Sequence, residues 1–561
     1  MKESLYCKQL AANGEGVTLL AQPKATFALT GARGCDKIRM LSRLLRAQWV
    51  AKALSDLGGI MSARFPVRGK SILLAILVSF LLPTGAALAS PSITLSKRTG
   101  PPTSRILVSG RGFAANVGVD IYFDTEDKAL VVTNNKGGFN KTAIRVPLEA
   151  SPGKHWITAL ERNNDKGAQE PFSVFTDWPQ FGFDASLSGF NPYENVLNKN
   201  NVAGLDVAWT YTSPTEYEFS NPAVWEDMVF AVEGGTLYAF DAETGTVLWT
   251  YGVGFAPPAV YKGVVYIQDG LRAEAFDART GTLLWSYTMD VGAATSVPPS
   301  VANGRLFVAS GDGPLYALNA TTGKLIWQFR PSDGWYLEWG AAVGYGAVYI
   351  GWNDADGNDY TYLYALDEKD GSVLWQTQQA VTGSPTVEYG LVFINNSNYE
   401  AMALDASTGA VVWQTKQYFG GTPAVANGTV YVSDGAGLAA LDAYTGEQLW
   451  QSSYGGVSPA VIANGVVYSG TGSAIDAIDA ATGDLLWTYP IGHNYAYSPA
   501  VANGWVFVPA FEASGNLYTQ LYAFRLKHGT TAEGLNSAER PSYSALQPDP
   551  KLKALNLSTG R

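Results

Sequence analysis

The stretch ALDASTGAVVW at residues 403–413 decides the fold of this chain, because six other stretches repeat its pattern. The seven copies and one earlier strand each carry a tryptophan, and these tryptophans recur every 36 to 48 positions. A period near 40 that is built of short strands is typical of β-propeller blades, and the repeats show no helical periodicity. The eight tryptophans are Trp209, Trp249, Trp285, Trp327, Trp375, Trp413, Trp450 and Trp487.

Each period divides into four short strands separated by turn residues. In the sixth period these are GTPAV, GTVYVSD, GLAALDA and EQLWQSS, between residues 421 and 453. The first strand contains proline in seven of the eight periods. Proline cannot donate to a strand ladder, so this strand is predicted to be an edge strand that faces the central channel.

The motif DAxTG inside the repeat has a structural explanation. An Asp side chain accepts hydrogen bonds from backbone N–H groups two residues on, and Gly adopts the positive φ that closes a hairpin. The tryptophan that follows is expected to lie between neighbouring blades. Seven copies of the motif therefore indicate a fold rather than a catalytic site.

The last period supplies only three strands, whereas the strand LDVAWTY at 205–211 has no blade of its own. Joining the two closes the ring and removes an open edge. The sequence thus predicts an all-β, eight-bladed propeller over 178–526, closed by its N-terminal outer strand. A small β-sandwich is expected at 91–177, and the polar residues 527–561 are expected to form a disordered tail.

The N-terminal residues carry a predicted export signal. Residues 61–89 combine Arg64, Arg68 and Lys70 with the apolar run SILLAILVSFLL and a closing ALA, which is typical of a signal peptide. The alternative is a membrane anchor, but about a dozen apolar residues fall short of a bilayer span. Residues 1–60 are left unassigned, and an over-extended start with Met61 as the true first residue would explain them.

Cleavage before Ser90 would exclude several kinds of site. Both cysteines, Cys7 and Cys35, precede it, so disulfides, Cys-ligated zinc and c-type haem are not expected. The net charge from residue 90 onward is −19, because residues 1–89 contribute +8 to the total of −11. Such an acidic chain disfavours nucleic acids and anionic lipid surfaces, and no stable membrane span is expected after cleavage.

The repeats resemble the PQQ-binding-like (pyrroloquinoline quinone) β-propeller family over residues 178–526. The opening WPQFGFDASLSGFNP, followed by NKNNVAGLDVAWTY, is similar to the start of such propellers. The segment before it is similar to immunoglobulin-like domains of the TIG type, through VSGRGF and VDIYFD. The family resemblance implies either a calcium-dependent quinoprotein dehydrogenase or a binding-only propeller such as the lipoprotein of the outer-membrane β-barrel assembly machine.

This sequence departs from both the dehydrogenases and the binding-only propeller. Many of the enzymes carry an adjacent Cys-Cys pair, and no cysteine follows residue 35 here. The calcium-binding Glu and Asn and the catalytic Asp of the enzymes match no position, so no catalytic residue is assigned. Ser90 stands where the lipoprotein would require a lipidated cysteine.

Aromatic residues in the blade connections are predicted to surround one end of the channel, the usual place for a ligand or partner. The alternative is that they only cap the blade ends. Asp354, Asp356 and Asn358 are weak candidates for a calcium-binding loop. An ordinary hairpin is the favoured interpretation of this segment, since it lacks the glycine and glutamate of such loops. The aromatic candidates are Tyr217, Phe219, Phe255, Trp335, Tyr336, Trp339, Tyr418, Phe419, Tyr495 and Tyr497.

We expect from the sequence an exported protein, periplasmic, at the cell surface or secreted, that binds a protein or small ligand without catalysis and without a cofactor. The alternative is a dehydrogenase that uses PQQ and calcium to oxidise an alcohol or a sugar. Carbohydrate binding without turnover, through the exposed aromatic residues, is a third hypothesis.

Overall fold

The structure of this chain is a computed structural model that describes residues 90–552 apart from short ranges. The chain divides into two units, Met1–Leu88 and Ala89–Arg561, of which the first lies outside the described residues. The N-terminal extension and the signal peptide therefore stay predictions. The ranges left out are 163, 214–216, 291–296, 310, 312, 332–336, 338, 354–360, 380, 434–436, 492–493, 513–517 and 528–537.

Residues 92–174 form two β-sheets that enclose one hydrophobic core. Fully buried Ile106 of one sheet packs in the same cluster as Ile121 and Phe172 of the other. A kinship with immunoglobulin-like domains stays a prediction. The first sheet has the order β1 (Ser92–Leu95), β3 (Arg105–Arg111), β6 (Phe139–Arg145), and the second has β2 (Thr99–Gly100), β8 (Gly167–Val174), β7 (Gly153–Glu161), β4 (Gly118–Phe123), β5 (Glu126–Val132).

The outer face of the second sheet is covered by residues 538–552, which we call the strap. Leu546 of the strap is buried in a small cluster with Tyr122 and Leu160 of this sheet. The predicted disorder of residues 527–561 is therefore wrong for the strap. Its composition is polar, but Leu546 removes apolar surface from water, and Trp156 and Gln169 donate to backbone carbonyl oxygens of the strap.

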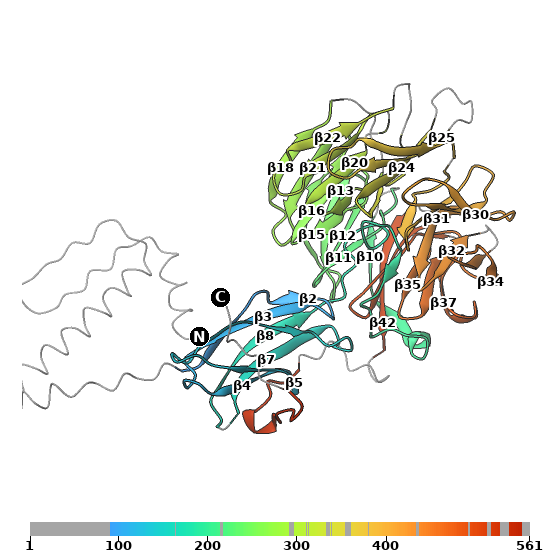
Figure 1. Cartoon of the computed structure of the whole chain (residues 1–561). Helices are drawn as coiled ribbons and strands as arrows, with labels where there is room; N and C mark the ends of the chain where they lie inside the picture. Colours follow the sequence, from blue (N-terminus) through green and yellow to red (C-terminus); the bar gives the residue numbers. More distant parts are fainter. Residues whose placement is uncertain are drawn as a thin grey trace, which may run out of the picture. The chain divides into compact units, whose positions relative to one another are not determined.

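Seven four-stranded antiparallel meanders follow one another along the chain, and in the last of them a short fifth strand pairs parallel with the first strand of the meander. The first three are β11 (Ala223–Trp225), β12 (Met228–Glu233), β13 (Thr236–Asp241), β14 (Val247–Gly252); β15 (Ala259–Tyr261), β16 (Val264–Asp269), β17 (Arg272–Asp277), β18 (Leu283–Thr288); and β19 (Ser300–Ala302), β20 (Arg305–Ala309), β21 (Leu315–Asn319), β22 (Leu325–Phe329). In Figure 1 their colours run from green to yellow-green in chain order.

The other four meanders have the same organisation, and these sheets confirm the predicted all-β propeller. They are β23 (Ala342–Gly344), β24 (Ala347–Asn353), β25 (Thr361–Asp367), β26 (Val373–Thr377); β27 (Thr386–Glu388), β28 (Leu391–Asn395), β29 (Ala401–Asp405), β30 (Val411–Gln414); β31 (Gly420–Ala426), β32 (Thr429–Ser433), β33 (Leu438–Asp442), β34 (Gln448–Ser452); and β35 (Val461–Ala463), β36 (Val466–Gly470), β37 (Ala474–Asp479), β38 (Leu485–Pro490).

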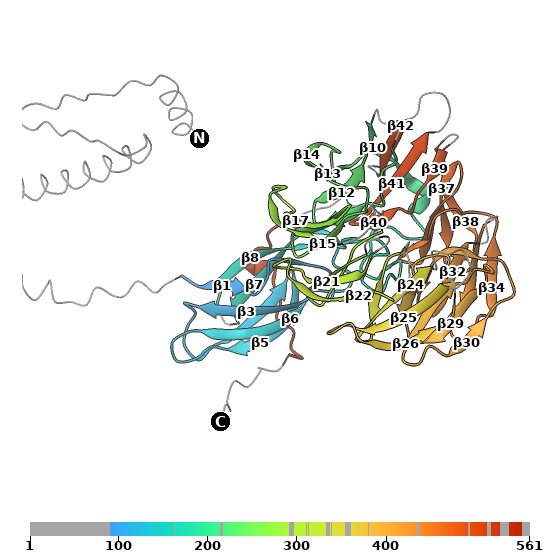
Figure 2. The ribbon, with the colours of Figure 1, turned by 90° about the horizontal axis from the view of Figure 1, so that it is seen from above.

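A further sheet joins the two ends of the propeller. β10 (Leu205–Ser213) pairs antiparallel with β42 (Tyr518–Leu526), and the register runs from Leu205 opposite Leu526 to Ser213 opposite Thr519. Figures 1 and 2 show these two strands side by side. The closure by the N-terminal outer strand is thus confirmed. The same sheet contains β39 (Asn494–Ala496), β40 (Ala500–Ala502) and β41 (Trp505–Glu512).

Residues 178–191, which we call the entry segment, run along the innermost strands of the blades. One residue of each inner strand offers a backbone group on its open edge, and the entry segment pairs with these groups in blade order. Its carbonyl, backbone N–H or side-chain groups bond to the main chain of Val224, Val260, Val301, Val343, Val387, Val425, Ile462 and Val501. The strand β9 (Phe190–Asn191) completes this run beside β35.

The repeated tryptophans form a joint between neighbouring blades, as predicted. Trp413 Nε1 donates to the carbonyl oxygen of Ala443 in the next sheet at 2.9 Å. Its ring lies against Gly446, where a Cβ atom would stand 2.6 Å from the ring. Asp442 Oδ1 accepts the N–H groups that shape this turn. The same bond and contact recur at Trp209, Trp249, Trp285, Trp327, Trp375 and Trp450.

The described ranges hold two 3₁₀ turns, η1 (Val202–Gly204) and η2 (Tyr543–Ala545). No helix in this part of the chain is long and apolar enough to cross a bilayer.

Replacing the glycine of one joint tests this architecture. Gly446→Ala places a methyl group against the Trp413 ring at a φ of +70°, so it combines a steric clash with backbone strain. We expect a loss of about 2–4 kcal/mol in the free energy of unfolding, measured by urea denaturation. Gly465→Ala is the matched control, because its φ is +79° but its surroundings are open. The control should lose only about 1 kcal/mol in the free energy of unfolding. Equal losses for the two variants would contradict a stabilising contact between Gly446 and the Trp413 ring.

Asp177, next to the entry segment, makes folding pH-dependent. Burial raises the pKa of its carboxyl to about 7, although the backbone N–H of Glu226 partly offsets the rise. A pKa raised by folding means that stability is highest when the group is protonated, so stability should fall as the pH rises from about 4 to 7. Asp177→Asn keeps the oxygen that accepts the Glu226 N–H and should flatten this slope. Denaturation midpoints across this pH range will measure the slope. Parallel slopes for the wild-type protein and Asp177→Asn would show that Asp177 does not cause the pH dependence.

Candidate functional site

The two ends of the propeller channel are built from different parts of the chain. In a four-stranded meander the first and third turns lie at one end, and the second turn and the link to the next blade lie at the other. The entry segment lies at the end of the first and third turns, where Asp177 accepts the N–H of Glu226 and Asn503 accepts that of Thr176. We call the opposite end, formed by the links between blades, the mouth.

The aromatic residues predicted at the mouth divide into exposed and buried groups. Tyr217 and Phe255 are 57% and 52% exposed, and their rings lie 5.8 Å apart. Tyr418 is 68% exposed. In contrast, Phe219 and Phe419 are each only 2% exposed and belong to the hydrophobic core, although Phe419 also borders the cavity described below. Each follows an exposed residue in the chain, and alternation along an extended segment turns it inward.

Other predicted site residues are not brought together. Trp339 is half-buried and packs against the core of the fourth and fifth blades. Trp335 and Tyr336 lie outside the described residues, as does the side chain of Tyr495. Tyr497 is partly buried, and its backbone N–H donates to Pro509 at 3.0 Å. The weak calcium candidates Asp354, Asp356 and Asn358 also lie outside the described residues.

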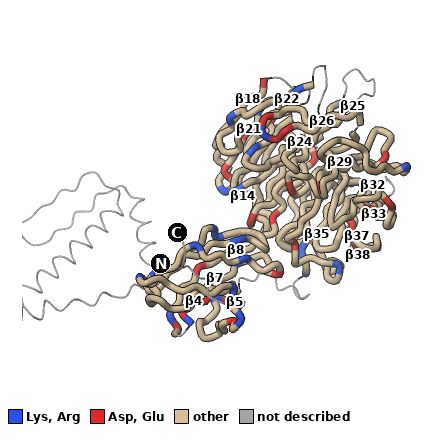
Figure 3. The backbone as a smooth tube through the Cα atoms, in the orientation of Figure 1, with Lys and Arg blue, Asp and Glu red and all other residues tan. Residues whose placement is uncertain are grey.

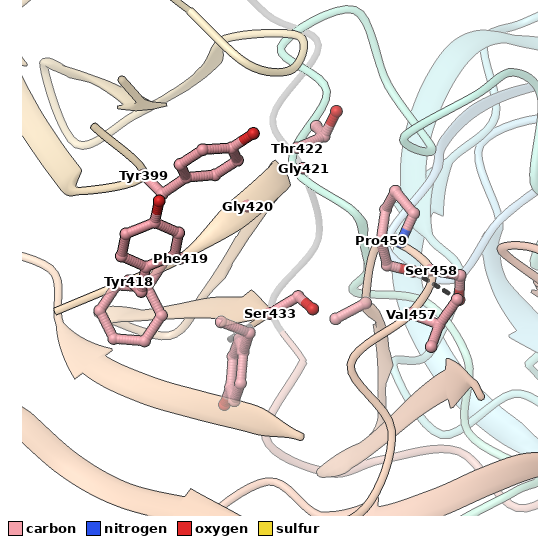
Figure 4. A pocket seen from close by; sticks show the side chains of 12 residues that line it. Tyr399, Tyr418, Phe419, Gly420, Gly421, Thr422, Ser433, Val457, Ser458 and Pro459 are labelled. Atoms are coloured by element: carbon pink, nitrogen blue, oxygen red, sulfur yellow. Dashed lines mark hydrogen bonds between the residues drawn. The ribbon is translucent and has the colours of Figure 1, made fainter. Parts of the chain in front are cut away.

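A cavity of about 310 Å³ opens at the mouth between the fifth, sixth and seventh blades. Figure 4 shows two tyrosines on one side of it and the segment 457–459 on the other. Pockets of this size that combine aromatic walls with a few polar groups are usual ligand sites. The lining residues are Tyr399, Tyr418, Phe419, Gly420, Gly421, Thr422, Tyr431, Ser433, Val457, Ser458, Pro459 and Ala460.

Tyr399 and Tyr418 form a stacked pair at the edge of the cavity. Their ring centroids lie 4.7 Å apart and the ring planes differ by 18°. Tyr399 has a φ of +60°, which a bulky side chain adopts only under constraint. The constraint comes from its loop, where Asn396 accepts N–H groups from Tyr399 and Glu400. The Tyr399 ring is therefore held in place before any ligand binds.

The polar groups of the cavity are hydroxyls and backbone atoms. Thr422 Oγ1 accepts the N–H of Ser384 at 3.1 Å, and Ser458 Oγ accepts that of Gly470 at 2.8 Å. Burial raises the pKa of Tyr431 to about 12, so its hydroxyl is neutral at physiological pH. The cavity thus offers hydrogen-bonding groups without a charge.

Sequence reasoning missed Tyr399 and the segment 457–459. A signal for Tyr399 was present, since it lies in the link between the second and third strands of its blade, which opens at the mouth. The predicted aromatic residues all lie in the links between blades, so Tyr399 is not among them. Val457 and Ser458 carry no such signal, because an aliphatic residue and a serine in a loop are common everywhere.

Two family profiles match this chain. The profile described as outer membrane protein assembly factor BamB matches residues 269–338, 358–491 and 435–553. The profile described as the β-propeller domain of glucose/ethanol/alcohol dehydrogenase matches residues 178–273. The chain belongs to the PQQ-repeat β-propeller family. The resemblance drawn from the repeats is therefore confirmed.

Curated relatives of this PQQ-repeat propeller include both enzymes and an assembly factor. Quinohemoprotein alcohol dehydrogenase of Comamonas testosteroni is 26% identical over 246 residues, which cover 42% of this chain and 30% of that protein. Outer membrane protein assembly factor BamB of Escherichia coli K12 is 35% identical over 94 residues, which cover 15% of this chain and 22% of that protein. The chain spans less than a third of the length of these relatives.

Solved structures share the fold at low identity. A quinohemoprotein alcohol dehydrogenase from Pseudomonas putida HK5 is 17% identical with a TM-score of 0.52, over 68% of this chain and 84% of that one. A europium-containing methanol dehydrogenase is 14% identical with a TM-score of 0.53, over 63% of this chain and 98% of that one. These similarities show the fold alone.

The expectation that this PQQ-repeat propeller has no cofactor is contradicted by its relatives, since quinohemoprotein and quinone-dependent alcohol dehydrogenases are among them. We also tested whether side chains of this chain fit such a group. Within the described ranges, no three His, Cys, Asp or Glu side chains come together in a way that could hold a metal ion. We therefore assign no residue to PQQ or calcium and derive no step through them.

Substitution of the neighbours Tyr418 and Phe419 separates a ligand-facing ring from a structural one. Tyr418→Ala should change the free energy of unfolding by at most about 1 kcal/mol, because the ring is mostly in water and loses only its stacking contact. Phe419→Ala should cost about 3–5 kcal/mol, because it leaves a cavity in the core. Urea denaturation of both variants gives the comparison. A large loss for Tyr418→Ala would mean that this ring caps a blade end.

Proposed function

We propose that this PQQ-repeat propeller is an exported binding protein that holds a ligand or a partner at its mouth. The observation that carries the proposal is the cavity beside the stacked rings of Tyr399 and Tyr418. An exposed aromatic pair, held by a hydrogen-bonded loop, costs little conformational entropy when a ligand binds. Such pre-organised rings are typical anchors of recognition sites.

The position of the entry segment supports the mouth as the site. The entry segment pairs with the inner strands of the blades and lies at the end of the first and third turns, so it does not occupy the end formed by the links. The exposed rings of Tyr217 and Phe255 lie in the links of the first two blades, at the same end as the cavity. Binding is therefore proposed for one face of the propeller.

A second candidate function is oxidation of an alcohol or a sugar by a quinoprotein dehydrogenase. It is favoured by the names of the relatives and by the matching dehydrogenase propeller profile. A calorimetric titration of the full chain with PQQ, with and without calcium, distinguishes the candidates. Tight one-to-one binding followed by reduction of an artificial electron acceptor would favour the dehydrogenase.

Site-directed photo-crosslinking tests the binding function directly. A photoreactive benzophenone amino acid in place of Val457, an exposed residue of the cavity, should give a discrete adduct in the producing cells. The adduct should be lost or reduced about 10-fold by Tyr399→Ala or Tyr418→Ala, because these rings supply the anchoring surface. Mass spectrometry of the adduct provides the measurement.

The control places the same amino acid at Tyr444, which is similarly exposed but lies in a turn between the third and fourth strands, at the end opposite the mouth. Equal labelling at both positions, or an adduct at 457 that is unaffected by the two alanine variants, would contradict the proposal.

A further inference from the structure

We infer that the cavity beside Tyr399 and Tyr418 binds an uncharged sugar ring of a glycan. This inference rests on the proposed binding function and specifies its ligand. It draws on three properties of the cavity: the absence of charge in its lining, the flat aromatic surface at its edge, and the hydroxyl groups around it.

The lining of the cavity contains no Lys, Arg, Asp or Glu among its described residues. Two acidic side chains outside the lining already accept hydrogen bonds, because Glu400 accepts from Asn396 and Asp476 accepts the N–H of Gly455. Charged residues are also sparse along the strands of the propeller in Figure 3. A phosphate or carboxylate would lose its hydration there without gaining a counter-charge, so a charged ligand is disfavoured.

The aromatic pair offers the surface that a sugar ring requires. Because the Tyr399 and Tyr418 rings are nearly parallel, they present a flat face rather than a slot. The face of an aromatic ring is electron-rich, and the C–H groups on one face of a pyranose carry a partial positive charge. Contact with the flat ring therefore contributes favourable binding free energy for a sugar. An aliphatic side chain would bind more favourably in an enclosed pocket.

Hydroxyl groups lie around this surface. The Thr422 hydroxyl accepts the Ser384 N–H, which leaves its proton available to donate to a ligand. The hydroxyls of Tyr399 and Tyr418 make no hydrogen bond to another described residue, and in Figure 4 that of Tyr399 points toward the side of the cavity on which Thr422 lies. Hydroxyls both donate and accept, which suits the hydroxyls of a sugar.

This site is less suited to a peptide that binds as an added strand than to a sugar. β31 and β32, which border the cavity, are already paired with each other at Gly420 opposite Ser433 and again from Ala424 opposite Tyr431, with a register shift between these pairs. The carbonyl oxygen of Gly421 accepts Asn395 Nδ2 at 2.8 Å. Recognition by an added strand depends on free backbone groups, so the rings and hydroxyls are the groups left to select the ligand.

The test is calorimetric titration of the full chain with a panel of neutral oligosaccharides: maltohexaose, cellohexaose, galactohexaose, mannohexaose and chitohexaose. We expect at least one to bind. Tyr418→Ala should weaken that binding about 10-fold or more, whereas Tyr418→Phe, which keeps the ring, should stay within about 3-fold. Tyr444→Ala removes an exposed tyrosine at the other end of the blades and should leave the affinity unchanged.

Two results would overturn the inference: none of the five oligosaccharides binds, or binding is insensitive to Tyr418→Ala. If the sugars fail while photo-crosslinking at 457 still gives an adduct that depends on Tyr399, the ligand class is wrong and the binding function stands. An adduct that proves to be a peptide would identify the other class of ligand. If the sugars and the crosslinking both fail, the binding function falls with the inference.

Discussion

The propeller depends on one constraint, which is that the open edge of every inner strand must find hydrogen-bond partners. A buried backbone group without a partner costs about as much as a lost hydrogen bond. The entry segment meets this need for all the blades, from Val224 of the first sheet to Val501 of the sheet that closes the ring. A short piece of chain thus ties the blades to a common axis through its backbone groups.

The blades are also held to one another by the repeated tryptophan contact, which is formed by residues of the repeat itself. The same eleven residues that turn the third strand into the fourth also supply the glycine and the carbonyl group on which the previous tryptophan rests. The Asp and Thr of the turn organise its backbone, so the seat for the tryptophan is formed locally. The links between blades carry no copy of this turn, although some of their aromatic residues, such as Phe219 and Phe419, also pack in the core.

Much of the fold could be predicted from the sequence because the repeat encodes it locally. The blade strands, the joint and the closure by β10 all follow from spacing, turn residues and one missing strand. The role of the entry segment could not be predicted, since it pairs with strands spread over the whole propeller and its residues do not indicate these partners. The strap was missed because its contacts, such as that of Leu546 with Tyr122, join residues more than 400 positions apart. At the mouth, Tyr418 was found by its position in a link, but Tyr399 needed the tertiary structure to reveal its stacking partner.

The pairing of β10 with β42 also determines when the molecule can be completed. During synthesis from the N-terminus, β10 is made before any of the seven complete blades, whereas its partner strand β42 is made after all of them. Contacts between such distant segments form slowly, because a large loop must be closed before they stabilise anything. During that interval β10 is an exposed edge with alternating apolar residues, a hazard for association with other chains. The ring that protects the finished protein from edge pairing therefore leaves the nascent chain dependent on protection from outside.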